Sequence, residues 1–151
     1  MIEQRKKESL IFYSINDNDA LKRIKIYESG VSAGFPSPAD DYLDVDLNLH
    51  KHLVKHPAST FFVIAKGYSM EKAGIKDNDI LVVDKSLEAK NNDIIIAILD
   101  GEFTVKRYFN NNNKVILSAE SESNKYSDIE ITESVEFEVW GVVTHTIHNH
   151  R

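Results

Sequence analysis

The strongest constraint on the fold is a pair of apolar runs separated by Asp100-Gly101. Residues 94–99 read Ile-Ile-Ile-Ala-Ile-Leu, and residues 102–106 read Glu-Phe-Thr-Val-Lys. Asp-Gly between two runs rich in β-branched and aromatic residues is typical of a two-residue hairpin turn. We therefore predict an antiparallel hairpin in which Lys106 lies opposite Ile95.

Further short apolar runs predict a larger sheet. They are bounded by turn residues, as expected of strands, and occupy residues 60–65, 80–83, 115–117 and 135–143. One short helix is predicted to precede them, with Asp46 as its N-cap and Pro57 closing it. The predicted fold class is mainly β, with twisted antiparallel sheets, a short helix and an extended N-terminal arm.

The first 45 residues differ from the rest of the chain. Their apolar positions are interrupted by a polar stretch at residues 16–19, and glycines and prolines crowd residues 29–41. Proline disfavours helix at the residue before it, and glycine favours turns. We expect residues 1–45 to form an arm with few contacts of its own, and residues 46–151 to form one β-rich domain.

Composition excludes several kinds of covalent bond and functional site. The 151 residues carry a formal net charge of -6 and no cysteine, which excludes disulfides, a thiol nucleophile and a zinc-thiolate site. The acidic balance disfavours non-specific binding to nucleic acid. The longest apolar run, residues 94–99, is too short to cross a bilayer, and the charged N-terminus leads into no apolar signal segment. We expect a soluble, cytoplasmic protein.

Two residues have the chemistry of a serine peptidase. Ser69 lies in the stretch Gly-Tyr-Ser-Met at residues 67–70, where the glycine favours a tight turn that exposes the hydroxyl and frees backbone N–H groups for an oxyanion. A lysine activates such a serine when burial favours its neutral amine. Alternation places Lys106 on one face with Thr104 but does not show whether that face is covered. A solvated strand lysine and an ordinary turn serine therefore remain open as alternatives.

Histidines offer a competing metal site. His52 and His56 are four residues apart on the predicted helix, a spacing that can ligate a metal, but no carboxylate motif accompanies them. A solvated helix face is the favoured interpretation. His145, His148 and His150 near the C-terminus are interpreted as a polar tail. We expect no metal and no cofactor.

Several separated motifs together resemble the LexA-like family of self-cleaving serine peptidases. They are residues 33–42 (Ala-Gly-Phe-Pro-Ser-Pro-Ala-Asp-Asp-Tyr), 46–48, 67–70, 74–79 and 100–107, and they follow one another in the family's order. The likeness runs from about residue 29 to the end of the chain. The first 28 residues do not match, and Tyr68 stands where the family often has a smaller or acidic residue.

The resemblance implies that Ser69 is the nucleophile, that Lys106 is the general base and that the bond between Ala33 and Gly34 is cut. It also implies a β-rich peptidase domain that forms a homodimer. In proteins of this type a RecA filament on single-stranded DNA stimulates self-cleavage during the SOS response. The shortened form then serves a Y-family polymerase in error-prone translesion synthesis.

Two alternatives stay open beside this type. A repressor of the family carries a helix-turn-helix domain before its cleavage bond, whereas only 33 residues precede Gly34 here, which we expect to be too few. The other alternative is a dimeric binding module without significant peptidase activity. We expect the polymerase-accessory type, with no membrane association and no direct sequence-specific DNA binding.

Overall fold

The computed structural model describes residues 11–14, 24–27, 33–34 and 44–151, and contacts divide the chain into two units. One unit comprises residues 1–15 and 56–151, and the other comprises residues 16–55. Within the described ranges, no helix has the length and apolar character needed to cross a membrane.

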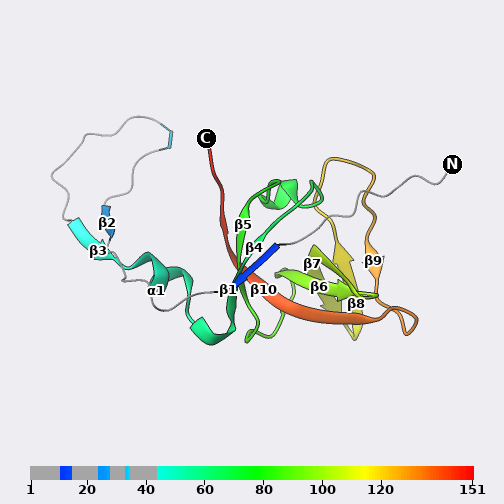
Figure 1. The fold of residues 1–151 in the computed structure, drawn as a ribbon. Helices are drawn as coiled ribbons and strands as arrows, with labels where there is room; N and C mark the ends of the chain where they lie inside the picture. Colours follow the sequence, from blue (N-terminus) through cyan, green and yellow to red (C-terminus); the bar gives the residue numbers. More distant parts are fainter. Residues whose placement is uncertain (1–10, 15–23, 28–32, 35–43) are drawn as a thin grey trace. The chain divides into compact units, whose positions relative to one another are not determined.

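The larger unit is built on an antiparallel sheet, which among the described residues has eight strands in the order β1-β4-β5-β10-β6-β7-β8-β9 (Figure 1). The strands are β1 (Ile11–Ser14), β4 (Thr60–Ile64), β5 (Ile80–Asp84), β6 (Ile94–Leu99), β7 (Glu102–Asn111), β8 (Lys114–Ser118), β9 (Ile129–Glu130) and β10 (Phe137–Ile147). Short 3-10 turns at Pro57–Ser59 and Glu71–Ala73 lie in the connections. The predicted mainly β fold is confirmed.

Strand β10 joins the two halves of this sheet. Its first part pairs with β6 and its last part with β5 (Figure 1). The register shifts between Val139 and Gly141 and again between Val143 and His145. Irregularities of this kind bend a strand and increase its twist, so that one long strand can serve both halves.

Gly141 lies where β10 approaches β5 closely, and its substitution should be costly. A Cβ on Gly141 would lie 2.6 Å from Val83 Cγ1 and 3.4 Å from Lys85 Cγ. Val83 is fully buried and has little room to move. We expect Gly141→Ala to destabilise the fold by about 1–3 kcal/mol, seen as a lower midpoint of urea unfolding at unchanged slope. Gly34→Ala is the control, because nothing lies within 4 Å of its Cβ position; equal midpoints for the two variants would contradict the prediction.

The predicted hairpin is confirmed in its turn and in its register. Lys106 lies opposite Ile95. Asp100 and Gly101 have φ values of 47° and 81°, the positive values that a type I′ turn requires at both central residues. Strand β7 extends beyond the predicted range to Asn111, because it also pairs with β8.

The core holds the segment that follows Ser69 close to β7. Met70 and Ile75 belong to one buried cluster with Ile96 of β6 and Val105 of β7. Apolar side chains from both segments are removed from water together, which stabilises their association. Burial of this cluster therefore brings the Ser69 turn near the strand that carries Lys106.

The smaller unit contains a hairpin and a helix. Strand β2 (Ile24–Tyr27) pairs with β3 (Asp44–Leu47), and α1 (Leu49–Leu53) follows. The predicted N-cap is wrong, because Asp46 lies inside β3. Asn48 caps α1 instead, and its side-chain oxygen accepts a hydrogen bond from the Lys51 N–H, as short polar side chains do at this position.

Part of the first 45 residues is paired in strands, whereas the described residues Ala33 and Gly34 lie in a bend outside any strand, and the expected arm stays a prediction. Strand β1 pairs with β4 through all four of its residues, and β2 pairs with β3. Such ladders satisfy backbone groups that an isolated arm would leave to water. The predicted loop at residues 29–41 lies outside the described residues except for Ala33 and Gly34. The domain boundary at residue 45 stays a prediction.

Candidate active site

Ser69 lies on a tight turn after β4. Gly67 has a φ of 97°, a conformation that residues with a side chain rarely adopt, and its N–H donates to Asp77 Oδ1 at 2.8 Å. The turn before the serine is therefore held by the Asp77 carboxylate. Ser69 is only 6% exposed, so it is more enclosed than the sequence predicted.

Lys106 is buried in β7, which answers the question that alternation left open. Lys106 is 6% exposed, and its Nζ donates to Thr104 Oγ1 at 2.9 Å and to the Val105 carbonyl oxygen at 3.1 Å. Both of these acceptors are uncharged. Burial penalises a charged amine because it removes the water that solvates the charge. Burial is the condition that the sequence left open for a lysine base, and the role of Lys106 as that base stays a prediction.

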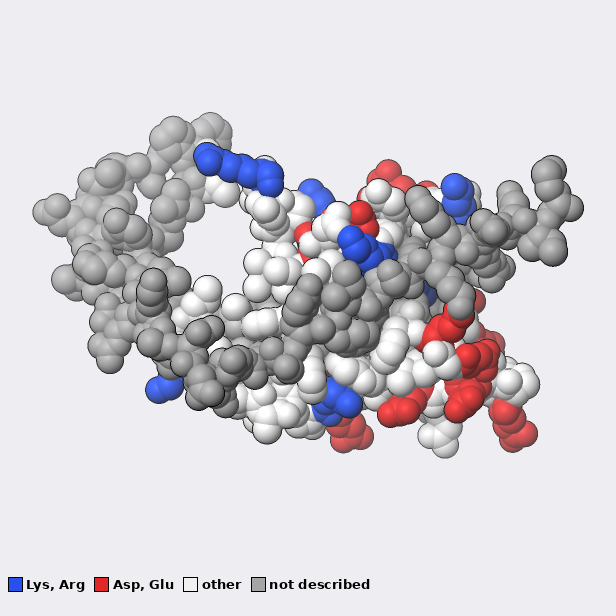
Figure 2. Space-filling view, in the orientation of Figure 1, with Lys and Arg blue, Asp and Glu red and all other residues white. Residues whose placement is uncertain are grey.

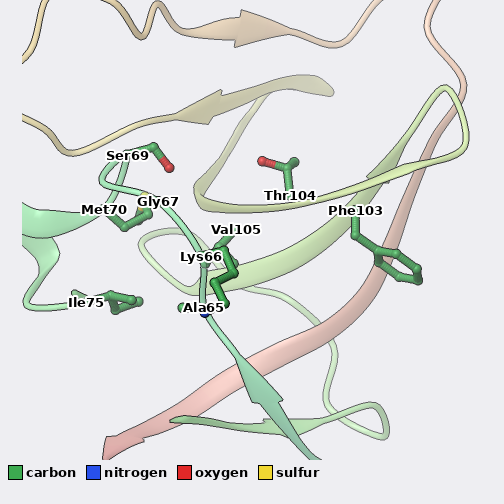
Figure 3. Close-up of a pocket in the computed structure, with 9 residues that line it drawn as sticks. All are labelled: Ala65, Lys66, Gly67, Ser69, Met70, Ile75, Phe103, Thr104 and Val105. Carbon is green, nitrogen blue, oxygen red and sulfur yellow. The ribbon is translucent and has the colours of Figure 1, made fainter. Parts of the chain in front are cut away.

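A small cavity brings the two segments together (Figure 3). It is lined by Ala65, Lys66, Gly67, Ser69, Met70, Ile75, Phe103, Thr104 and Val105. In Figure 3 the hydroxyl groups of Ser69 and Thr104 point into the space between the turn and β7. Lys106 is not among the described residues that line this cavity, but its Nζ donates to the hydroxyl of Thr104, which does line it. The pairing of Ser69 as nucleophile with Lys106 as base stays a prediction.

Thr104 is a site residue that sequence reasoning missed. It lies two positions before Lys106 in β7, so both side chains project from the same face of the strand. That spacing was a usable signal, because a threonine hydroxyl beside a buried amine can accept its hydrogen bond. Nothing in the sequence showed that the same hydroxyl also lines a cavity with Ser69.

An ion pair lies beside the site, between Arg107 and Glu120. Arg107 Nε and Nη2 donate to Glu120 Oε1 and Oε2 at 2.6 and 3.1 Å. The hydrogen bond to Glu120 raises the pKa of Arg107 above its ordinary value, and the hydrogen bond from Arg107 lowers the pKa of Glu120 below its ordinary value. Both side chains are therefore charged in the neutral pH range.

The predicted cleavage bond between Ala33 and Gly34 is exposed. It belongs to the unit of residues 16–55, whereas Ser69 and Lys106 belong to the other unit. The cutting of this bond by Ser69 stays a prediction.

His52 and His56 do not lie on one helix face. This corrects the prediction that both residues belong to the same helix, on which the alternative of a metal site rested. Helix α1 ends at Leu53, so His56 lies beyond it, and His56 Nδ1 is 2.5 Å from Asp84 Oδ2. Burial raises the pKa of Asp84, but hydrogen bonds from Ser86, His56 and Ser59 outweigh it and leave the pKa below the ordinary value. In the C-terminal tail, His148 Nδ1 is 2.5 Å from Oδ1 of the buried Asp79.

Charge on the described surface is mixed. In Figure 2 acidic side chains gather at one side of the face shown, while lysine and arginine side chains are scattered over it. Proteins that bind duplex DNA through its phosphates cluster their basic residues on one face. The described residues on the face shown in Figure 2 form no such cluster.

A peptidase family matches most of this chain. The family described as Peptidase S24-like matches residues 25–144. Protein MucA of Salmonella typhimurium is 42% identical over 127 residues, which cover 84% of this chain and 86% of MucA. Protein ImpA of Escherichia coli is 40% identical over 126 residues, which cover 83% of this chain and 84% of ImpA. A LexA repressor of Idiomarina loihiensis is 32% identical over 119 residues, which cover 79% of this chain and 57% of the repressor.

Proposed function

We propose that this chain, which belongs to the Peptidase S24-like family and is UmuD-like within it, is a serine endopeptidase that cuts itself between Ala33 and Gly34. One observation carries the proposal. Ser69 shares a cavity with Thr104, and the Thr104 hydroxyl accepts a hydrogen bond from the buried amine of Lys106. The proposed nucleophile and the proposed base thus come from two separate segments.

The reaction proceeds through an acyl-enzyme. Ser69 Oγ attacks the carbonyl carbon of Ala33 while neutral Lys106 accepts the hydroxyl proton. The tetrahedral intermediate then collapses to an ester between Ser69 and Ala33, and Lys106 returns the proton to the departing amine of Gly34. Water hydrolyses the ester with Lys106 again as the base, which leaves a carboxylate on Ala33 and restores the Ser69 hydroxyl.

The cavity suits a small substrate side chain. Ala65, Met70 and Ile75 give it apolar walls beside Ser69, and a methyl group such as that of Ala33 can be accommodated there. Because the scissile bond is part of the same chain, its effective concentration at the site is high once the arm docks. A modest base is then sufficient, and docking of the arm becomes the step at which cleavage can be regulated.

We further propose a role in the SOS response. A RecA filament on single-stranded DNA stimulates the cleavage, and the shortened homodimer acts as accessory subunit of a UmuC-like, Y-family polymerase in error-prone translesion synthesis. Similarity to MucA and ImpA over more than four fifths of each chain supports this role.

Incubation of the purified chain with a RecA filament on single-stranded DNA, followed by intact-mass analysis, tests this function. The expected products are residues 1–33 and 34–151. Ala33→Glu should remain intact, because its charged side chain would lose hydration against apolar walls. Products with a different boundary would contradict the assigned bond.

The two alternatives predict different results. A binding module without peptidase activity stays at its original mass while it still associates with the filament or the polymerase. A repressor shifts a duplex DNA fragment of defined sequence in a gel, at a salt concentration that suppresses non-specific binding.

A further inference from the structure

We infer that the Arg107–Glu120 ion pair is a positioning element of the peptidase site, which holds the Ser69 turn in register with the strand that carries Lys106. The inference rests on the proposed function. Neither residue is among the described residues that line the cavity. The pair therefore acts through the backbone rather than by touching the reacting atoms.

The backbone of Glu120 is bonded to the Ser69 segment at two points. The Glu120 N–H donates to the Ser69 carbonyl oxygen at 2.8 Å, and the Glu120 carbonyl oxygen accepts from the Lys72 N–H at 2.8 Å. One of these bonds involves the serine's own peptide unit. A displacement of Glu120 therefore displaces the backbone of the nucleophile or breaks these two hydrogen bonds.

The side chain of Glu120 is fixed by a guanidinium that is itself held at three points. Two Arg107 nitrogens donate to the two carboxylate oxygens, and Arg107 Nη1 donates to the Asn92 carbonyl oxygen at 2.8 Å. Planar, bidentate pairing of this kind fixes direction as well as distance. Arg107 directly follows Lys106 in β7, so the pair connects the strand of the base to the turn of the nucleophile.

The sheet cannot provide this connection by itself. The last pair between β7 and β8 is Arg107 with Ser118, and β8 ends there. Glu120 lies two residues beyond that end, where no ladder between β7 and β8 fixes the backbone. Beyond this point the ion pair fixes Glu120 to β7. The backbone hydrogen bonds of Glu120 with Ser69 and Lys72 are thereby fixed relative to the same strand.

Self-cleavage rates of four full-length chains test the inference: the unaltered chain, Glu120→Gln, Arg107→Gln and the double variant. Each single variant should slow the first-order rate roughly 10- to 100-fold, the scale on which small misplacements of reacting groups act. The double variant should be no slower than the slower single variant, because both changes remove the same contact. The melting temperature should fall by only about 2–4 °C.

The pH profile separates positioning from an effect on the charge of Lys106. A positioning role lowers the rate at every pH and leaves the midpoint of the profile in place. A shifted midpoint with an unchanged maximum rate would overturn the inference. Arg107→Lys keeps the positive charge but loses the bidentate pairing, so this variant should also cleave slowly. If Arg107→Lys cleaves as fast as the unaltered chain, the inference is overturned as well.

Two controls keep the inference distinct from the proposed function. Glu130→Gln removes a surface ion pair with Lys114, whose Nζ is 3.1 Å from Glu130 Oε2, and it should cleave at the unaltered rate. If Ser69→Ala still cleaves, the proposed function fails whatever the pair does. If Ser69→Ala is inert and Glu120→Gln cleaves at the unaltered rate, only the positioning role fails.

Discussion

Lys106→Ala should leave the chain uncut under conditions that convert the unaltered chain to its two products. A general base contributes roughly 10²–10⁴-fold to such a reaction, and loss of this factor takes a slow self-cleavage below detection. Ser69→Ala removes the nucleophile and should be inert for that reason. A time course of intact-mass spectra measures both variants against the unaltered chain.

Lys66→Ala is the matched control, because Lys66 is a lysine that lines the cavity itself, whereas Lys106 is connected to the cavity through Thr104. Its amine donates to the Asn78 side-chain oxygen in an exposed hydrogen bond, whereas the Lys106 amine is buried against Thr104. We expect Lys66→Ala to cleave at close to the unaltered rate. The opposite pattern would assign the base to Lys66. Circular dichroism spectra should show that each variant retains its sheet, so that loss of cleavage reports chemistry rather than unfolding.

Self-cleavage without an activator should accelerate with pH, by about tenfold per unit below the pKa of the base. Only a neutral amine accepts a proton, and a lysine in water has a pKa of about 10.4. The neutral fraction therefore grows as pH rises, and the rate should increase toward about pH 9–10 and level off once most of the amine is neutral. First-order rate constants from pH-jump samples, read by gel or mass, give the profile.

The shape of this profile identifies the base. A flat rate from neutral to alkaline pH would count heavily against a lysine. A plateau reached near pH 7 would indicate a base with a pKa near neutral, either an imidazole or a lysine whose pKa burial has lowered, and the Lys106→Ala profile decides between them. Lys106→Ala should lack the rise altogether, which separates enzyme-borne cleavage from simple alkaline hydrolysis of the chain.

Local patterns were sufficient for the elements that depend on neighbours in sequence. The turn at Asp100-Gly101 and its hairpin register follow from a two-residue turn and a period of two, and both are confirmed. The turn before Ser69 follows from Gly67, whose positive φ is confirmed as well. The cap of α1 was wrong because Asp46 and Asn48 have similar capping chemistry, and pairing of β3 with β2 decided between them.

Long-range contacts decided the parts of the site that the pattern left open. Alternation assigns Lys106 and Thr104 to one face, but other segments of the chain determine whether that face is covered. The sequence around Glu120 gave no signal of its role. That role depends on a hydrogen bond between the segment after β8, which contains Glu120, and the segment after β4, which contains Ser69. Strand β1 was not predicted, because its short apolar stretch stands just before the polar residues 16–19 and its pairing with β4 is a long-range contact.

The amino-acid sequence by itself determined the hairpin, the mainly β class, the serine turn and, through its ordered motifs, the family resemblance, because each of these is encoded in short stretches of chain. The tertiary structure alone showed that Lys106 is buried, that its amine donates to Thr104, which lines a cavity with Ser69, and that Glu120 is bonded both to Arg107 of β7 and to the Ser69 backbone. The physical reason is that burial and hydrogen-bond partners belong to pairs of distant segments, and those pairs exist only after the sheet has formed.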